Sequence, residues 1–394
     1  MNKYLFSLSI PIMLMFTDVS AQEATIEEVQ WCTAAKLKNA DGSTSLGFAG
    51  AINAVFNDGL LVAGGANFPD KMPWEGGAKF YSNNIHILLK QDGHYVWSTK
   101  TLSVKLPHPI AYCGNTSTDS GIVYAGGEGK DGLSNKAYII SWDAADLKVS
   151  VKPLPDLPVA ITNVGLTHIG NVVYLVGGDM EKGSSSAFYK LDLNAKDASW
   201  QELPSLPLKL ANALVVAQSD KIFVIGGRTK TPSGISDLHN TTFAYDIAKA
   251  NWQKMADISD GEHTTNFSAG AGVAVSNDLI LVTGGDNGSV FHKIENYISQ
   301  ISKATSQEEK DKLTKEKNKL NVSHKGFYKE QLVYNINTNT WHKIGELPFP
   351  AHVTTTATKW GSDIVLSNGE IKPGVRTPSV MIGRIKVGQL KKEE

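Results

Sequence analysis

Six apolar stretches, each ending in a turn of two small residues, recur along this 394-residue chain. The turns are Gly64-Gly65, Gly126-Gly127, Gly177-Gly178, Gly226-Gly227, Gly284-Gly285 and, in altered form, Asn368-Gly369. Successive turns lie 62, 51, 49, 58 and 84 residues apart. A period of about 50 residues with a diglycine is typical of the kelch blade of a β-propeller. The repeat therefore predicts an all-β, six-bladed kelch-type β-propeller.

The residues that follow the turns support the same repeat. A tryptophan recurs late in four units, at Trp97, Trp200, Trp252 and Trp341. One sheet cannot bury its own faces, so we expect these side chains to pack between neighbouring blades. The second unit departs from the pattern, with Val149 or Val151 at the tryptophan position.

The two ends of the chain complete the sixth unit. Only one strand, 378–385, follows the last turn, and the stretch 26–34 contains Trp31 but has no turn before it. We expect this N-terminal stretch to be the fourth strand of blade six. Closing the ring in this way removes free sheet edges.

The first 21 residues have the features of a secretory signal peptide. Lys3 is followed by an apolar run, 4–16, and then by Val19-Ser20-Ala21 as a cleavage site. We expect residues 22–394 to form one propeller domain, exported to the periplasm in a Gram-negative source. The apolar run is short and contains Pro11, so no permanent membrane span is expected.

Composition limits the partners. The net charge of −1 gives no basic footprint for nucleic acid. Cys32 and Cys113 fall on non-adjacent blades, and two unpaired buried thiols are favoured over a disulfide. The spacing of His and Cys does not resemble a zinc site, and no metal or organic cofactor is expected. The sequence leaves the oligomeric state open.

Two insertions interrupt the repeat. The longer, about 290–325, falls between the second and third strands of blade five and carries Ile294, Tyr297, Ile298 and Ile301 at helical spacing. It predicts a helical pair with its apolar stripe on the propeller rim. This pair is either a lid or a solvated excursion. The shorter insertion, 67–83, is expected to place Phe68, Trp74, Phe80 and Tyr81 on the same side.

The residue after each turn should project into a ring around one mouth of the central channel. This ring consists of Ala66, Glu128, Asp179, Arg228, Asp286 and Glu370. An alternative role is local pairing, for example of Arg228 with Asp179 or Asp286. Glu370 stands apart because it follows the only turn in which the first glycine is replaced, by Asn368.

The segment Asn368-Gly369-Glu370-Ile371-Lys372-Pro373-Gly374-Val375-Arg376-Thr377 resembles the signature of the sialic-acid mutarotases, also called N-acetylneuraminate epimerases. Leu46-Gly47-Phe48-Ala49-Gly50 and the segment 63–68 resemble a second stretch of that family. The Gly-Phe-Ala-Gly blade comes first in this chain and the Asn-Gly-Glu blade last. The order is that of a cyclically permuted branch, in which each blade keeps its neighbours.

The resemblance implies interconversion of the α and β anomers of N-acetylneuraminate, a small sugar acid, with no cofactor. Glu370 is then the catalytic acid/base, and Arg376 is its partner and the group that holds the sugar carboxylate. Water, His352 or Asp286 is the second proton-transfer group. Further substrate contacts are expected at Asn67, Arg228, Asp286, Asn368 and Lys372.

Other functions stay open at this point. A kelch propeller can be a non-catalytic scaffold that binds a carbohydrate or a protein, since a fold does not define a function. A mutarotase of another acidic sugar would carry the same signature. A copper oxidase is disfavoured because both cysteines lie on apparently structural strands.

Overall fold

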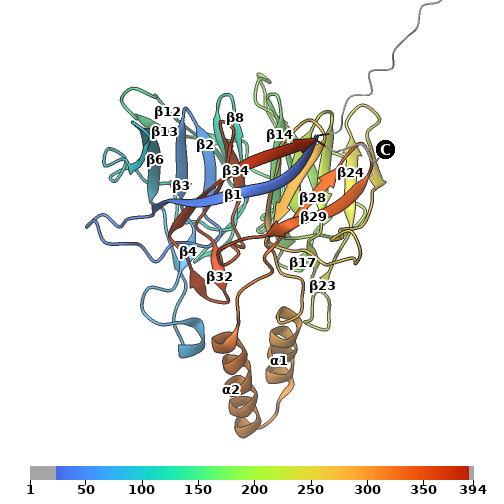
Figure 1. Cartoon of the computed structure of the whole chain (residues 1–394). Helices are drawn as coiled ribbons and strands as arrows, with labels where there is room; N and C mark the ends of the chain where they lie inside the picture. The colour runs from blue at the N-terminus through green and yellow to red at the C-terminus, as the bar shows by residue number, and fades with distance from the viewer. Residues whose placement is uncertain (1–23, 390–394) are drawn as a thin grey trace, which may run out of the picture.

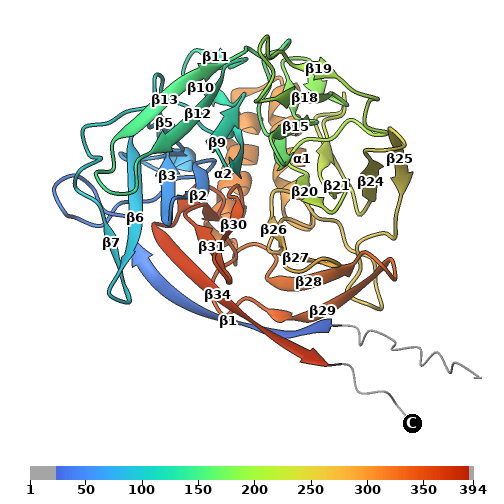
Figure 2. The ribbon, with the colours of Figure 1, turned by 90° about the horizontal axis from the view of Figure 1, so that it is seen from above.

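Six four-stranded antiparallel sheets surround a central axis in the computed structural model, which describes residues 24–389 (Figure 1). Figure 2 shows the sheets as blades around the axis. The predicted six-bladed propeller is confirmed. The expected signal peptide, 1–21, lies outside the described residues.

In each blade the first strand lines the channel and the fourth lies at the outer edge. Blade one has β2 (Ile52–Phe56), β3 (Gly59–Ala63), β6 (Ile85–Gln91) and β7 (His94–Trp97). Blade two has β8 (Gly114–Thr118), β9 (Gly121–Ala125), β12 (Ala137–Trp142) and β13 (Val149–Leu154). Blade three has β14 (Gly165–Ile169), β15 (Val172–Val176), β18 (Phe188–Asp192) and β19 (Gln201–Glu202).

The other three blades follow the same order. Blade four has β20 (Leu214–Gln218), β21 (Lys221–Ile225), β24 (Thr242–Asp246) and β25 (Asn251–Lys254). Blade five has β26 (Ala271–Ala274), β27 (Leu279–Thr283), β28 (Glu330–Asn335) and β29 (Thr340–Glu346). Blade six has β30 (Ala357–Trp360), β31 (Asp363–Ser367), β34 (Ser379–Gln389) and β1 (Ala24–Lys36).

The N-terminal strand closes the ring as predicted. β1 lies antiparallel to β34 at the outer edge of blade six, where the two run side by side (Figure 2). Trp31 on β1 reaches the preceding blade, because its Nε1 donates to Gln331 Oε1 at 2.7 Å and its ring lies 5.5 Å from Phe349. Closure therefore joins blades five and six through one buried seam.

The outer tryptophans also join neighbouring blades. Each indole N–H donates to a backbone carbonyl of the preceding blade: Trp97 to Lys36 at 2.8 Å, Trp200 to Pro155 at 2.9 Å, Trp252 to Pro204 at 2.8 Å and Trp341 to Ala256 at 3.2 Å. Between the sheets, aliphatic side chains such as Leu61 and Ile122 are fully buried. The repeated tryptophan thus combines apolar burial with a satisfied indole donor.

The diglycine turns make the closest contact between blades. At the first turn the N–H of Gly65 donates to the carbonyl of Ile110 in the next blade at 2.8 Å. A Cβ on Gly64 would lie 2.6 Å from that same oxygen, and φ is +64° there. Turns two to four repeat this arrangement, so glycine is needed for the close approach as well as for the backbone angle.

A closed belt of backbone hydrogen bonds surrounds the channel. Six residues with φ between 52° and 62° lie one before each first strand, and the N–H of each donates to the carbonyl of the belt member in the preceding blade. The members are Gly50, Tyr112, Asn163, Asn212, Ala269 and Thr354, with N···O distances of 2.8–3.0 Å. Asn163 and Asn212 tolerate this left-handed conformation well. Beyond the belt, the first strands line a cavity of about 400 Å³.

Five blades carry a two-stranded ribbon after the second strand, on one face of the propeller. The ribbons are β4 (Ala66–Asn67) with β5 (Phe80–Tyr81), β10 (Glu128–Gly129) with β11 (Gly132–Leu133), β16 (Asp179–Met180) with β17 (Gly183–Ser184), β22 (Arg228–Thr229) with β23 (Asp237–Leu238), and β32 (Glu370–Lys372) with β33 (Val375–Arg376). A short 3-10 helix, Pro73–Glu75, lies inside the blade-one insertion. Blade five has helices α1 (Phe291–Lys303) and α2 (Gln307–Ser323) in place of a ribbon.

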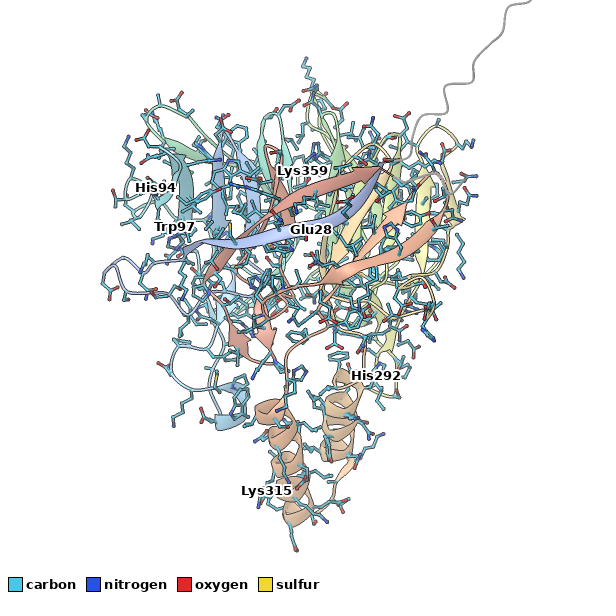
Figure 3. All side chains as sticks on the ribbon, in the orientation of Figure 1. Glu28, His94, Trp97, His292, Lys315 and Lys359 are labelled. Atoms are coloured by element: carbon cyan, nitrogen blue, oxygen red, sulfur yellow. The ribbon has the colours of Figure 1, made fainter. Side chains whose placement is uncertain are left out.

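The helical pair is confirmed between the second and third strands of blade five. It projects from the propeller face, with His292 at its propeller end and Lys315 further out, whereas Lys359 lies on the opposite face (Figure 3). The expectation that the apolar stripe lies on the rim is only partly met. Ile298 is 51% exposed, and the helices pack on each other and contact the propeller through polar side chains.

The cysteine expectation needs one correction. Cys32 and Cys113 are both free, as expected, but Cys32 is exposed rather than buried. It lies on β1, the outermost strand of its blade, so its side chain faces solvent instead of another sheet. Cys113 contacts the carbonyl of Gly126 at 3.3 Å, and burial raises the pKa of its thiol.

Candidate active site

The residues that follow the six turns occupy equivalent positions. Each forms an isolated bridge with the residue just before a belt member: Ala66 with Ala49, Glu128 with Ala111, Asp179 with Thr162, Arg228 with Ala211, Asp286 with Ser268 and Glu370 with Val353. These six positions surround the mouth of the channel on the propeller face that carries the two-stranded ribbons. The side chains differ in what they contact, and only part of the ring can serve a ligand.

Glu370 and Arg376 face each other across the β32–β33 ribbon. They are register partners, and Glu370 Oε1 lies 2.9 Å from Arg376 Nη1. The same oxygen accepts the backbone N–H of Gly374 at 2.6 Å. Gly374 has φ +81° and packs on Pro73 and Trp74 of blade one, so a side chain there would be strained and crowded. The Pro-Gly turn therefore brings the two predicted residues together.

The Arg376 guanidinium is held from three sides. Its Nε donates to the carbonyl of Ala66 at 3.2 Å, and its Cζ lies 5.1 Å from the ring centre of Phe68. Its Nη1 is buried, and the contact with Glu370 is an ion pair without an aligned hydrogen bond. The side chain is 4% exposed. The guanidinium group is thus held in a fixed position, and it still has N–H groups that can donate to a ligand.

Tyr112 forms the wall between blades one and two. Its backbone belongs to the belt, and burial raises the pKa of its phenol to about 12, with the Arg376 charge opposing the shift. The phenol is therefore protonated at neutral pH. Nearby, Glu128 accepts from Tyr81 at 2.7 Å and from Lys79 at 3.1 Å, which uses the ring carboxylate of blade two locally.

Asp286 lies in the blade next to Glu370 and in a different environment. Its Oδ1 accepts the N–H of Gly288 at 2.7 Å. Burial raises the pKa of this carboxyl, although the hydrogen bond from Gly288 opposes the shift. Glu370 instead contacts a guanidinium. Two carboxyl groups in such contrasting surroundings can take different roles in acid/base chemistry.

Arg228 is in a buried ion pair. Its Nη2 lies 2.6 Å from Asp179 Oδ2, and Lys230 adds a contact of 3.3 Å to the same oxygen. Although burial opposes it, the two cations lower the pKa of Asp179. Arg228 therefore pairs locally with Asp179, which is the alternative role that the sequence left open.

The remaining predicted residues lie in different positions. Asn368 is fully buried with φ +59°, and its Oδ1 accepts the N–H of Phe48 at 3.2 Å. Asn67 donates to the carbonyl of Gly47 at 3.0 Å, whereas its buried Oδ1 has no hydrogen-bond partner among residues 24–389. Lys372 lies on β32 next to Glu370 and is half-buried. His352 is buried, and burial lowers its pKa to about 4.

One residue of the mouth, His324, carries no signal in the sequence. It follows α2 and is 6% exposed, and its pKa responds to the charges of Asp286, Lys372 and Glu370. Burial is the larger influence and lowers that pKa. The helical pattern of 290–325 indicates an insertion but does not tell where its last turn points. Sequence reasoning therefore missed this histidine.

The described part of the chain contains neither a metal-binding cluster nor a helix that could span a membrane. Between residues 24 and 389, no cluster of three or more His, Cys, Asp or Glu side chains is arranged to hold a metal ion. In the same stretch, neither helix is long and apolar enough to cross a membrane.

The fold and the mouth define a kelch-type β-propeller with a glutamate–arginine pair on its one altered turn. The model of the N-acetylneuraminate epimerase family matches residues 154–393, which include that turn. The chain belongs to this family. Relatives bearing the name N-acetylneuraminate epimerase are 31% identical over 234 residues in Haemophilus influenzae strain PittEE, 29% over 229 in Salmonella typhimurium and 30% over 253 in Brucella melitensis.

The matches cover only part of each protein. They include 58%, 57% and 63% of this chain and 59%, 56% and 63% of those relatives, in the same order. The chain therefore aligns with less than two thirds of the length of these relatives. An alignment that keeps the order of residues can match a cyclically permuted chain over only one continuous stretch. Partial coverage is therefore compatible with the permuted order. That order stays a prediction.

Proposed function

We propose that this protein is a mutarotase that accelerates interconversion of the α and β anomers of N-acetylneuraminate. The observation that carries the proposal is the Glu370–Arg376 pair, 2.9 Å apart at the mouth, on the turn that departs from the repeat. A carboxylate can move a proton, and a planar guanidinium fork suits the carboxylate of a sugar acid. The names of the relatives supply the sugar.

The reaction requires only proton transfer and one reversible C–O bond cleavage. A base removes the proton of the anomeric hydroxyl, the bond between the anomeric carbon and the ring oxygen breaks, and that oxygen takes a proton from an acid. The open form carries a ketone. Rotation about the bond to that ketone exposes its other face, and the reverse proton transfers close the ring as the other anomer. No net proton is gained or lost.

The environments of the two carboxyl groups suggest their roles. Glu370 accepts from Gly374 beside Arg376, which suits a carboxylate acting as the base. Asp286 has its pKa raised by burial, which suits a proton donor. Burial keeps the pKa of His352 near 4 and shields its ring, so Asp286 is the better second group of the two considered.

The direct test is proton NMR on N-acetylneuraminate freshly released by a sialidase. We expect the α signals to convert to β signals faster with the protein than without it. Spontaneous conversion at the same rate in both samples would reject the sialic-acid proposal. Running other acidic keto sugars in parallel tests the alternative substrate, and binding without acceleration would indicate a carbohydrate-binding scaffold.

Asp286→Asn provides a prediction with two independent readouts. We expect kcat to fall about 10²-fold, because the amide cannot donate a proton as an acid. At pH 7 the free energy of unfolding should hold or rise, because the amide is neutral in both the folded and the unfolded chain, whereas the fold disfavours ionisation of the Asp286 carboxyl, and the amide Oδ1 can still accept from Gly288. Urea unfolding at pH 4, 5.5 and 7 measures the second effect.

The sign of the pH effect follows from the raised pKa of Asp286. A raised pKa contributes stability that is present below the ordinary carboxyl pKa and lost as pH rises through the folded value. The advantage of Asp286→Asn over the wild type should therefore grow from pH 4 to pH 7. Asp131→Asn, an exposed change on the blade-two ribbon, is the control. Full activity in Asp286→Asn would remove Asp286 from the mechanism.

We also propose that the enzyme acts in the periplasm. The charged start, apolar run and small-residue site of residues 1–21 support export. Cell fractionation of a source strain, with a cytoplasmic marker enzyme as control, tests this. Recovery of the protein only with the cytoplasmic marker would contradict it.

A further inference from the structure

The helical pair is anchored at both sides of the mouth. Glu295 of α1 accepts the backbone N–H and the hydroxyl of Ser236, both at 2.7 Å, in the loop of blade four. Asn318 of α2 donates to the carbonyl of Trp74, at 3.0 Å, in the blade-one insertion. The pair is therefore held across the ring by specific polar contacts and is more than a solvated excursion.

These contacts place the residue that ends the pair. His324 directly follows α2, is 6% exposed and packs 5.3 Å from the Phe327 ring. Two residues on, Gly326 lies against blade six, because a Cβ there would be 3.6 Å from the carbonyl of Ile371. Gly326 thus lies next to the strand that carries Glu370, and His324, two residues before it, is near enough for the charges of Asp286 and Glu370 to act on its pKa.

The hydrogen bonding of His324 determines its tautomer. Its Nδ1 accepts the backbone N–H of Gly326 at 3.0 Å, so the ring proton is on Nε2. Burial lowers the pKa of His324, Asp286 and Glu370 act to raise it, and Lys372 acts to lower it. The imidazole is therefore neutral at pH 7. The Nε2 atom is accessible to solvent and has no hydrogen-bond acceptor among residues 24–389.

We propose that His324 is the electrophile of the reaction, with its Nε2–H donating to the sugar oxygen that becomes negative as the ring opens. A neutral imidazole can serve in this way because it donates without having to lose its proton. Donors placed in advance where charge develops are among the strongest catalytic devices. The inference rests on the proposed function. In this proposal, the helical pair positions His324 at the mouth of the channel.

Substitutions at His324 separate a donor at Nε2 from mere packing. The amide nitrogen of Gln can reach the Nε2 position, whereas that of Asn lies nearer Nδ1. We expect kcat to fall about 10²-fold in His324→Ala and His324→Asn and less than about tenfold in His324→Gln, with KM changing little. The exposed His263→Ala is the matched control. Thermal unfolding of each variant checks the fold.

Two results would overturn the inference. One is wild-type kcat in a folded His324→Ala protein. The other is an equal loss in all three variants that follows their thermal stability, which would indicate a structural role.

A readout without catalysis separates this inference from the proposed function. In protein with ¹⁵N-labelled histidine, the Nε2 resonance of His324, assigned by its loss in His324→Gln, should shift when N-acetylneuraminate is added. A shift in a protein that does not accelerate mutarotation would uphold the contact and reject the function. An unshifted resonance at a saturating sugar concentration would reject the contact even if the wild type is active.

Discussion

Glu370→Gln is expected to lower kcat for anomer interconversion by about 10²–10⁴-fold, the usual contribution of a positioned acid or base. The amide cannot take a proton from the anomeric hydroxyl. Its oxygen can still accept from Gly374, so the β32–β33 ribbon should keep its shape. The rate is measured by proton NMR or polarimetry on the freshly released sugar.

Glu128→Gln is the matched control for this change. Glu128 occupies the equivalent ring position in blade two, but it is bound by Tyr81 and Lys79. We expect its substitution to change kcat less than tenfold, which is less than about 1.4 kcal/mol in the activation free energy. A Glu370→Gln protein that retains the wild-type rate would refute the assigned mechanism and leave the function itself standing.

Arg376→Lys is expected to lower kcat/KM by about 10–100-fold, mainly through KM, because a charged hydrogen bond contributes about 1.5–3 kcal/mol. Lysine keeps the charge, but it cannot form a planar fork for the sugar carboxylate. It also loses the contact of the guanidinium with Phe68 and the bond to the Ala66 carbonyl. Initial rates over a range of sugar concentrations separate KM from kcat.

The control for Arg376 is Arg384→Lys on β34. Arg384 is exposed and lies 3.8 Å from Asp363, far from a bidentate geometry. We expect wild-type kinetics from this variant. If Arg376→Lys left KM unchanged and lowered the free energy of unfolding, Arg376 would be a structural residue of the blade-six turn.

Much of the fold could be predicted because its causes repeat along the chain. The close approach at Gly64 recurs at three later turns, and the indole bond of Trp97 recurs in three later blades. A contact made repeatedly leaves the same residue type at the same spacing. The closing strand was predictable from Trp31 for the same reason.

The site was predictable only where it is local. Glu370 and Arg376 are six positions apart, and a Pro-Gly turn between them indicates a ribbon that pairs them. Phe68 and Tyr112 reach the same guanidinium region from blades one and two. Their approach depends on closure of the whole ring, which their own sequence neighbours do not record.

The buried position of Asn368 shows the same limit. Its replacement of a glycine marks the sixth turn as unusual, yet only the fold shows why: its carboxamide binds the backbone of Phe48 across the closure. The exposure of Cys32 was also missed, because burial on an outermost strand depends on what lies beyond the sheet.

By itself, the sequence determined the six-bladed repeat, the closing strand, the insertion in blade five and the unusual turn that leads to Glu370. Each of these depends on contacts within one blade or on a contact repeated in every blade. The tertiary structure decided which ring residues pair internally, which carboxyl is buried and where His324 lies. Those outcomes depend on single contacts between distant segments, and a contact made once leaves no periodic pattern in the chain.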